Sequence, residues 1–351
     1  MSVQTIAAAD ALARLREFSA VIDARSEGEY AIDRLPGALN WPSLHDDERV
    51  RVGTMYKQVN PFEARKIGAA LVARNIASHI ERECMDKPKH WRPLLYCWRG
   101  GQRSGALALV LGQIGFRVSL IEGGYKAFRA AMLADLPARV ERLSFRVICG
   151  PTGSGKTRLL HALAAAGAQV LDLEGLARHR ASVLGAIPGV PQPTQKHFEM
   201  CVWDALRALD AARPVYVEAE SKKVGNLTLP EPLIAAMRAS ACLRVELSED
   251  ERVALLLEDY PFFVSDPAYF GQRLDTLTAL RGRAVVDGWK AQIAAGHTEA
   301  VVRELLEKHY DPGYASSTRR NFARFEQARV VRLAGRSAAA MAAASAEILA
   351  D

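Results

Sequence analysis

The feature of this sequence that most constrains its fold is a glycine-rich loop, GPTGSGKT, at residues 150–157. An apolar run at residues 145–149 precedes the loop, and residues 158–166 follow it with the pattern of a helix. A loop of the form GxxxxGK[ST] between a strand and a helix directs backbone N–H groups at phosphate oxygens. We therefore predict a parallel α/β domain whose loop binds a diphosphate group, with no requirement for a nucleotide base.

The loop assigns roles to individual residues. Lys156 is expected to reach the terminal phosphate, and the hydroxyl of Thr157 can hold Mg²⁺. Glu218, near the end of a predicted strand, stands where a second acid usually faces such a metal, although a solvated strand end is the alternative interpretation of Glu218 and Glu220. No metal site is certain from this pattern. The predicted phosphate-binding residues are Gly150, Thr152, Gly153, Ser154, Gly155, Lys156, Thr157 and Glu218.

A second anion-binding loop follows Cys97. A short apolar run at residues 94–96 reads as a buried strand, and residues 105–115 have a helical pattern. Inward-pointing N–H groups and the helix dipole stabilise both a thiolate and a tetrahedral oxyanion in such a loop. A buried structural cysteine is the alternative, but the glycines and Arg103 favour catalysis. We predict Cys97 and Arg103 as catalytic residues and an oxyanion loop of Trp98, Arg99, Gly100, Gly101, Gln102 and Ser104.

Composition restricts the class of protein. The chain has 351 residues, of which 49% are hydrophobic, enough for two domains that each bury a core. Its five scattered cysteines argue against a disulfide framework and for a reducing compartment, and no ligand spacing predicts structural zinc. The N-terminus does not resemble a signal peptide, and no apolar run is long enough to span a membrane. We expect a cytoplasmic protein.

Basic residues suggest a nucleic-acid partner. The net charge is +6, with a pI near 9.1. Residues 314–336 contain six arginines among aromatic residues, a combination that suits phosphate backbones and unpaired bases, although a solvated helix face is the alternative. His179 and Arg180, on a predicted loop beside the phosphate site, have a solvated basic turn as their alternative. The predicted RNA-binding residues are His179, Arg180, Arg319, Arg320 and Arg324.

Alternating strand and helix patterns predict two domains, at residues 1–137 and 144–351. A change of composition around Pro137 marks the boundary. In the second domain we expect strands at residues 169–174, 214–221 and 242–247 and a largely helical chain from about residue 252 onward, ending in a helix over residues 337–349. The predicted fold class is α/β in both domains, with a helical, basic C-terminal region.

Four stretches of the first domain, taken in order, resemble a rhodanese domain: residues 23–30, 35–38, the Cys97 loop and residues 122–125. Five residues separate Cys97 from Arg103, one more than in the usual sulfurtransferase loop, as in rhodanese-like dual-specificity phosphatases. A wider loop should suit a larger anion, such as phosphate or selenophosphate.

A rhodanese-like domain followed directly by a phosphate-loop (P-loop) domain, with residues 172–180 and 218–225, resembles the tRNA 2-selenouridine synthases over nearly the whole chain. The resemblance implies a selenotransferase that acts on wobble 2-thiouridine in the tRNA anticodon loop. Geranyl diphosphate first alkylates the sulfur, and selenium from selenophosphate then replaces it. The resemblance implies no organic cofactor, and Mg²⁺ is compatible with it.

The resemblance also makes Cys97 the residue that takes up selenium or serves as a covalent relay. Three other functions remain open at this point: an ATP-dependent tRNA sulfurtransferase, a rhodanese-like phosphatase, and a non-catalytic RNA-binding protein. The sequence does not locate a pocket for the geranyl tail. Residues 260–263 are one candidate, with core packing as the alternative.

Overall fold

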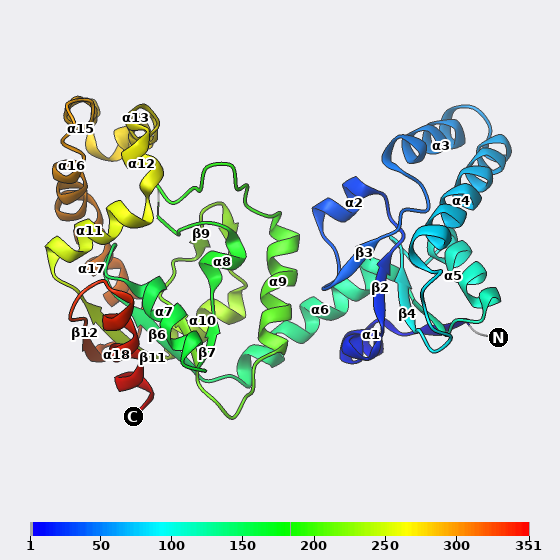
Figure 1. Cartoon of the computed structure of the whole chain (residues 1–351), viewed down its shortest axis with the longest axis horizontal. Coiled ribbons are helices and arrows are strands. Elements are labelled where there is room, and N and C mark those ends of the chain that lie inside the picture. The colour runs from blue at the N-terminus through cyan, green and yellow to red at the C-terminus, as the bar shows by residue number, and fades with distance from the viewer. Residues whose placement is uncertain (1–2, 183, 351) are drawn as a thin grey trace. The chain divides into compact units, whose positions relative to one another are not determined.

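The computed structural model describes residues 3–182 and 184–350. Its contacts divide the chain into two compact units, Met1–Pro137 with Thr194–Asp204, and Ala138–Pro193 with Ala205–Asp351. Each unit is built on a five-stranded sheet, and every strand pairing described within these two sheets is parallel (Figure 1). The predicted α/β fold class is therefore confirmed.

The sheet of the first unit has the strand order β1-β5-β4-β2-β3. Its central strand β4 is buried along its length, since Leu94, Leu95 and Tyr96 are fully inaccessible. The strands are β1 (Val3–Ile6), β2 (Ala20–Asp23), β3 (Ala38–Asn40), β4 (Pro93–Tyr96) and β5 (Val118–Ile121). The helices are α1 (Ala8–Ala13), the 3₁₀ turn η1 (Leu15–Glu17), α2 (Glu27–Ile32), α3 (Asp46–Gln58), α4 (Pro61–Glu83), α5 (Gln102–Ile114) and α6 (Gly124–Glu141).

A segment from later in the chain completes the first unit. Helix α9 (Gln195–Arg207) packs Trp203 edge-on against Phe128 of α6, with ring centroids 5.9 Å apart. The Trp203 indole N–H donates to Asp135 Oδ2 at 2.8 Å. Both aromatic side chains are fully buried. Residues 194–204 therefore belong to the first unit, although they follow the P-loop in the sequence.

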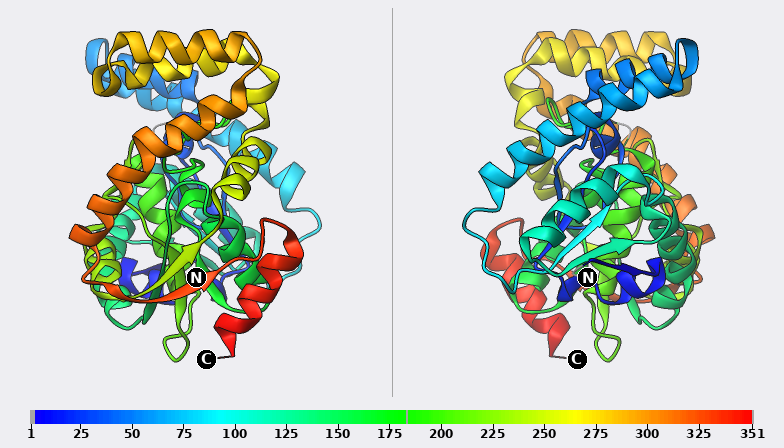
Figure 2. Two further views of the ribbon diagram at one scale, coloured as in Figure 1. Left: turned by 90° about the vertical axis from the view of Figure 1, so that its left-hand side faces the viewer. Right: turned by 90° about the vertical axis from the view of Figure 1, so that its right-hand side faces the viewer.

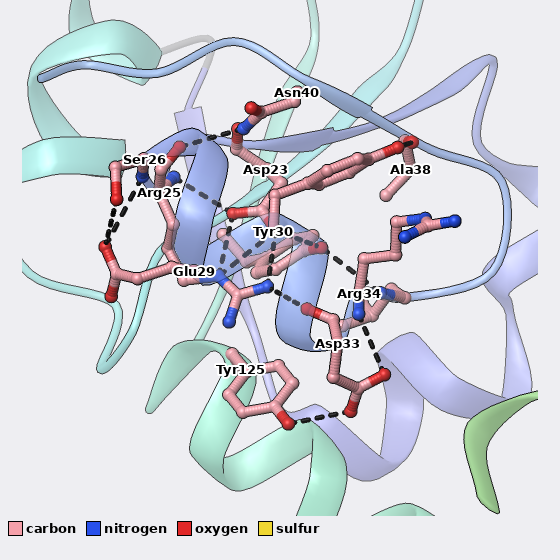
Figure 3. Close-up of polar contacts among 12 residues, drawn as sticks. Asp23, Arg25, Ser26, Glu29, Tyr30, Asp33, Arg34, Ala38, Asn40 and Tyr125 are labelled. Carbon is pink, nitrogen blue, oxygen red and sulfur yellow. Dashed lines mark hydrogen bonds and ion pairs between the residues drawn. The ribbon is translucent and has the colours of Figure 1, made fainter. Parts of the chain in front are cut away.

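Asp33 is the polar centre of this first unit. Its side chain is buried and accepts a hydrogen bond from Tyr125 Oη at 2.7 Å (Figure 3). Arg129 Nη1 lies 3.3 Å from Asp33 Oδ2, and His197 Nδ1 of α9 lies 3.3 Å from Oδ1. The backbone carbonyl of Asp33 accepts from Arg25 Nη2 at 2.6 Å. One carboxylate thus connects α2, α6 and α9.

The sheet of the second unit has the order β12-β11-β6-β8-β7. Its strands are β6 (Phe145–Cys149), β7 (Gln169–Leu171), β8 (Val215–Glu218), β11 (Ala241–Glu246) and β12 (Arg324–Arg332), and a separate antiparallel pair is β9 (Lys223–Val224) and β10 (Leu227–Thr228). The helices are α7 (Lys156–Ala165), α8 (Leu173–Ala177), α10 (Glu231–Ala239), α11 (Glu249–Asp259), α12 (Pro261–Ser265), α13 (Pro267–Leu274), the 3₁₀ turn η2 (Asp275–Leu277), α14 (Thr278–Arg281), α15 (Arg283–Ala294), α16 (Thr298–Leu305), the π-helical turn η3 (Leu306–Tyr310), α17 (Asp311–Asn321) and α18 (Ala338–Leu349).

The structure corrects two local predictions. Residues 324–332, predicted within a helical region, form the edge strand β12, which runs parallel to β11 (Figure 2). Phe325 and Val331 are the buried side chains of this strand, and pairing with β11 outweighs local helix preference. The predicted strand at residues 169–174 ends at Leu171, because Asp172 caps α8 by accepting from Gly175 N. The terminal helix is confirmed as α18.

Helix α6 continues through Pro137 to Glu141, so the predicted boundary between the two domains falls inside a helix.

None of the described helices combines the length and apolar character that a bilayer crossing demands.

We predict a pH-dependent contribution of His197 to stability. Hydrogen bonds to Asp33 and Cys201 raise the pKa of His197 to about 9, against the effect of burial. A folded-state pKa above the unfolded value near 6.5 gives stability that is complete below about pH 6.5 and is lost as pH rises through 9. His197→Gln should therefore lower the free energy of unfolding by roughly 1.5–3 kcal/mol at pH 6, and by much less at high pH.

Urea unfolding of both proteins at about pH 6 and pH 10 measures this difference. The exposed His90 provides the control, since His90→Gln should have the same small effect at both pH values. A His197→Gln effect that does not change with pH would contradict the prediction.

Candidate active site

The first candidate site is the loop that leaves the carboxyl end of β4. In a parallel sheet, ligands bind at this edge, and β4 is central in its sheet, between β5 and β2. Cys97 directly follows β4, and α5 begins at Gln102 with Gly101 as its N-cap. The predicted strand, loop and helix are thus in their expected order.

Cys97 lies at the floor of this loop. The residue is 3% exposed, whereas residues 99–102 of the loop are exposed. Ser104 Oγ donates to Cys97 Sγ at 3.1 Å, and the thiol faces the carbonyl of Gly101 at 3.9 Å. The rim of the loop, rather than the thiol, therefore meets solvent.

Two glycines permit the close packing of this loop against the start of α6. Gly124 has a φ of +59°, and a Cβ there would lie 2.3 Å from the carbonyl oxygen of Cys97 and 2.4 Å from Gly100 N. Gly100 has a φ of +67°, which also favours glycine. Tyr125 N donates to the Cys97 carbonyl at 2.8 Å, and the Tyr125 ring stacks on Trp98. The β5–α6 turn thus supports the loop from behind.

Arg103 is held by a carboxylate that the sequence analysis did not single out. Arg103 Nη1 lies 2.5 Å from Oε2 of Glu29, which is in helix α2. Burial acts to raise the pKa of Glu29, but bonds and charge from Arg103 lower it below its usual value. The motif Ser26-x-x-Glu29 could have identified a helix start, but no sequence signal linked it to Arg103. Glu29 fixes Arg103 at the side of the Cys97 loop.

The second candidate site is the P-loop, which connects β6 to α7. Gly153 and Gly155 have φ values of +76° and +84°, conformations that favour glycine at both positions. Lys156 Nζ donates to the carbonyls of Gly150 at 2.7 Å and Pro151 at 3.1 Å. The ammonium group therefore closes over the loop, where phosphate oxygens bind in such motifs.

Three carboxylates converge beside Lys156 and Thr157. Oxygens of Glu174, Glu218 and Glu220 lie within 4.8 Å of one another. Burial, followed by the charge of Glu218, raises the pKa of Glu174 to about 8. Burial also raises the pKa of Glu218 and of Glu220. Glu218 is thus the predicted site residue of this cluster, and Glu174 and Glu220 join it in the structure.

This carboxylate cluster fits a divalent cation. Glu218 is 3% exposed, and its Oε1 has no hydrogen-bond partner among the described residues. Thr157 Oγ1 lies 3.5 Å from Glu174 Oε2, so a hydroxyl oxygen lies beside the carboxylate oxygens as a further donor. Such a set of hard oxygen donors is of the kind that Mg²⁺ prefers.

A cavity of about 910 Å³ surrounds the P-loop, which we refer to as the P-loop cavity. Its walls include the three carboxylates and the aromatic residues Tyr260, Tyr310 and Tyr314. Tyr314 Oη accepts a hydrogen bond from Gly150 N, and Arg252 donates to the Thr152 carbonyl at 2.8 and 3.0 Å. These two supporting residues, from α17 and α11, had no recognisable signal in the sequence.

The predicted RNA-binding residues fall into two groups. His179 and Arg180 line the P-loop cavity, and the Arg180 guanidinium lies 4.8 Å from the centre of the Tyr260 ring. Arg319, Arg320 and Arg324 are exposed and do not line it, although Asn321 and Phe322 beside them do. Arg319 forms an ion pair with Glu326 at 3.0 Å.

Comparison with known proteins links both sites to one family. Residues 143–267 match the family model described as the tRNA 2-selenouridine synthase AAA domain, and residues 7–131 match the rhodanese-like domain. A protein of Alcanivorax borkumensis named tRNA 2-selenouridine synthase is 33% identical over 326 residues, covering 84% of this chain and 88% of that protein.

Two further relatives of the same name match a smaller part of their length. The protein of Nitrosomonas europaea is 39% identical over 244 residues, and that of Marinobacter nauticus is 38% identical over 243 residues. Each alignment covers 68% of this chain. The aligned chain spans 63% and 65% of these two relatives, which is less than two thirds of their length.

We predict that Gly124→Ala displaces the Cys97 loop. The left-handed backbone conformation alone costs about 1–2 kcal/mol for alanine, and the added methyl group would overlap the Cys97 carbonyl and Gly100 N. The free energy of unfolding should fall by at least that amount, and alkylation of Cys97 by iodoacetamide should become faster as the loop moves away.

Gly105→Ala is the matched control. This glycine lies in α5, where a Cβ meets nothing within 4 Å, so alanine should be neutral or stabilising. Equal stability and equal alkylation rates for Gly124→Ala and the unchanged chain would contradict the close approach described above.

Proposed function

Because the chain belongs to the tRNA 2-selenouridine synthase family, we propose that it replaces the sulfur of wobble 2-thiouridine in tRNA by selenium through an S-geranylated intermediate. Geranyl diphosphate and selenophosphate are the proposed small substrates. The observation that carries this proposal is a P-loop whose cavity shares part of its wall with an apolar pocket, which suits a diphosphate that bears an apolar tail.

In the proposed first step, the thiocarbonyl sulfur attacks the allylic carbon of geranyl diphosphate and diphosphate departs. Negative charge develops on the leaving group, and preorganised positive groups lower the energy of that transition state. Lys156 and the backbone N–H groups of Gly153 and Gly155 are the groups we propose for this role. If Mg²⁺ binds, Thr157, Glu174, Glu218 and Glu220 would hold it, and it would supply further positive charge to the diphosphate.

We propose that the geranyl tail binds in an apolar pocket beside the P-loop cavity. This apolar pocket, of about 50 Å³, is lined by Phe263, Phe270, Val302 and other residues of the helical region. Thr152, Leu256, Tyr260 and Tyr310 line both it and the P-loop cavity. We therefore propose that the tail lies along this shared wall with its end in the apolar pocket. Tyr260 and Phe263 fall within the stretch at residues 260–263 that the sequence offered as a candidate.

In the proposed second step, selenium from selenophosphate replaces the geranylated sulfur, which leaves as a thiol. Alkylation makes this sulfur a better leaving group than the original thiocarbonyl sulfur. Cys97, whose sulfur accepts a hydrogen bond from Ser104, is proposed as the covalent relay: its thiolate attacks C2 of the base and geranyl thiol leaves. The selenium of selenophosphate then attacks C2 and expels the Cys97 thiolate, and water cleaves the Se–P bond to give 2-selenouridine and phosphate. Arg103, oriented by Glu29, and the loop N–H groups would hold the phosphate that departs.

Mass spectrometry of wobble nucleosides tests the proposal. 2-Thiouridine tRNA is incubated with geranyl diphosphate and selenophosphate in the presence of the unchanged chain, Lys156→Ala or Cys97→Ala. Lys156→Ala should slow geranyl addition by roughly 10²–10³-fold, as expected for loss of a charge-stabilising donor. Cys97→Ala should accumulate S-geranyl-2-thiouridine and form no 2-selenouridine.

Cys84→Ala and Lys222→Ala are controls for the loss of a buried cysteine and of an exposed lysine away from either loop. The proposal fails if the unchanged chain leaves 2-thiouridine tRNA unmodified. ATP hydrolysis that requires Lys156, without any use of geranyl diphosphate, would instead support a nucleotide-dependent enzyme.

A substitution in the apolar pocket should alter the preference for tail length. Val302 is half-buried in its wall, and Val302→Phe adds volume where the end of the tail is proposed to lie. The KM for geranyl diphosphate should rise roughly tenfold, while the KM for dimethylallyl diphosphate, with its shorter tail, should change little. Val285→Phe, at an exposed position outside the pocket, is the control. Equal changes for both diphosphates would contradict this location of the tail.

A further inference from the structure

A third cavity, which we refer to as the cationic pocket, adjoins the P-loop cavity on another side. It has a volume of about 520 Å³ and is lined by Arg178, Lys223 and Arg273 among other residues. None of its described lining residues carries a carboxylate. Arg178 and Lys223 bring two positive charges to a wall whose described residues carry no carboxylate, which favours an anionic ligand, and the volume lies in the range of pockets that bind small molecules.

The cationic pocket shares part of its wall with the P-loop cavity. Arg178, His179, Ser182 and Ser221 line both spaces. Ser182 also lines the apolar pocket, so the short segment at residues 178–182 borders all three spaces. A ligand in the cationic pocket can therefore extend toward the P-loop.

A buried polar atom at this boundary lacks a partner. His179 is 8% exposed, and its Nδ1 has no hydrogen-bond partner among the described residues. Burial and the nearby charge of Arg273 lower the pKa of His179, so its imidazole is neutral and can donate or accept one hydrogen bond at Nδ1. Buried polar groups are nearly always paired in folded proteins, which points to a ligand that supplies the missing partner.

Two of the cations are accessible from solvent. Arg178 and Lys223 are exposed, and Lys223 is presented by the short β9–β10 hairpin. The preceding residue, Lys222, does not line the pocket and instead lies 3.6 Å from Glu231. The hairpin thus directs one of two adjacent lysines to the pocket and the other to a carboxylate.

We propose that the cationic pocket receives the RNA nucleotide to be modified, with Arg178 and Lys223 contacting its flanking phosphates and His179 contacting the edge of its base. A lone phosphate would leave most of the volume of about 520 Å³ empty. A nucleotide combines negative phosphates, which can contact the exposed cations, with a polar base edge, which can pair with the His179 imidazole. The inference rests on the proposed function for the identity of the RNA.

Salt-dependent binding tests this assignment independently of catalysis. The affinity of the full chain for 2-thiouridine tRNA is measured by fluorescence anisotropy at several salt concentrations, without geranyl diphosphate or selenophosphate. Each single-stranded phosphate that a cation no longer neutralises reduces the slope of log K against log salt by about 0.7. The double variant Arg178→Gln/Lys223→Gln should therefore reduce the magnitude of the slope by about 1.4 and weaken binding at low salt. Lys222→Gln, the matched control, should retain the slope of the unchanged chain.

Substitutions of His179 test the interaction with the base. His179→Ala should raise the Kd for tRNA, measured by the same anisotropy titration, without a change in the salt slope, because the imidazole is neutral. His179→Asn, whose side-chain amide places a polar atom near the position of Nδ1, should restore part of the affinity. Circular dichroism and thermal unfolding of both variants establish that the fold is retained.

The outcomes separate this inference from the proposed function. If the double variant binds tRNA with an unchanged slope, or if inorganic phosphate binding is abolished while tRNA binding is unaffected, the nucleotide assignment is overturned. If the unchanged chain fails to modify tRNA but the double variant still shows reduced salt-dependent affinity, the proposed function fails and the RNA-binding pocket stands.

Discussion

The cost of burying a charge without a partner distinguishes the buried carboxylates of the two units. In the first unit the protein itself supplies the partner, since the fully buried Asp23 carboxylate accepts three hydrogen bonds of 2.6–3.1 Å from the Arg25 guanidinium and another from Tyr96 Oη. In the second unit Glu218 and Glu220 are equally buried, but Lys156 is the principal cation that acts on their pKa. The negative charge of Asp23 is thus balanced by Arg25. The negative charges of Glu218 and Glu220 exceed that of their one principal cation, so protons or a bound cation must balance the rest.

This difference gives the two loops different characters. The Cys97 loop rests on close backbone packing at Gly124 and on the ion pair between Arg103 and Glu29, so its anion-binding groups are already oriented. The P-loop has a lysine bound to its own carbonyls and three carboxylates that repel one another. In the proposed reaction, Lys156 would exchange these carbonyls for oxygens of the diphosphate. We therefore expect ligand binding to stabilise the P-loop more than the Cys97 loop.

Local sequence patterns predicted the parts of the structure that local interactions determine. Strand β6, the P-loop and the start of α7 follow from a contiguous motif, as do β4 and the Cys97 loop. Strand β12 could not be predicted because pairing with β11, far away in the sequence, decides its conformation. The same limit applies to the ion pair between Glu29 and Arg103 and to the addition of Glu174 and Glu220 to the predicted Glu218. Each depends on proximity that the topology creates between distant segments.

The packing of α9 in the first unit has a consequence for how this chain is made. During synthesis on a ribosome, the rhodanese-like segment emerges first, but the surface around Phe128 stays uncovered until Trp203 has also left the exit tunnel. A gene fragment that stops at Pro137 would express a domain with an exposed aromatic patch and with Asp33 lacking His197. The useful boundary for preparing this domain alone is therefore not a single cut in the sequence, and a soluble version would need the α9 segment joined to it by a linker.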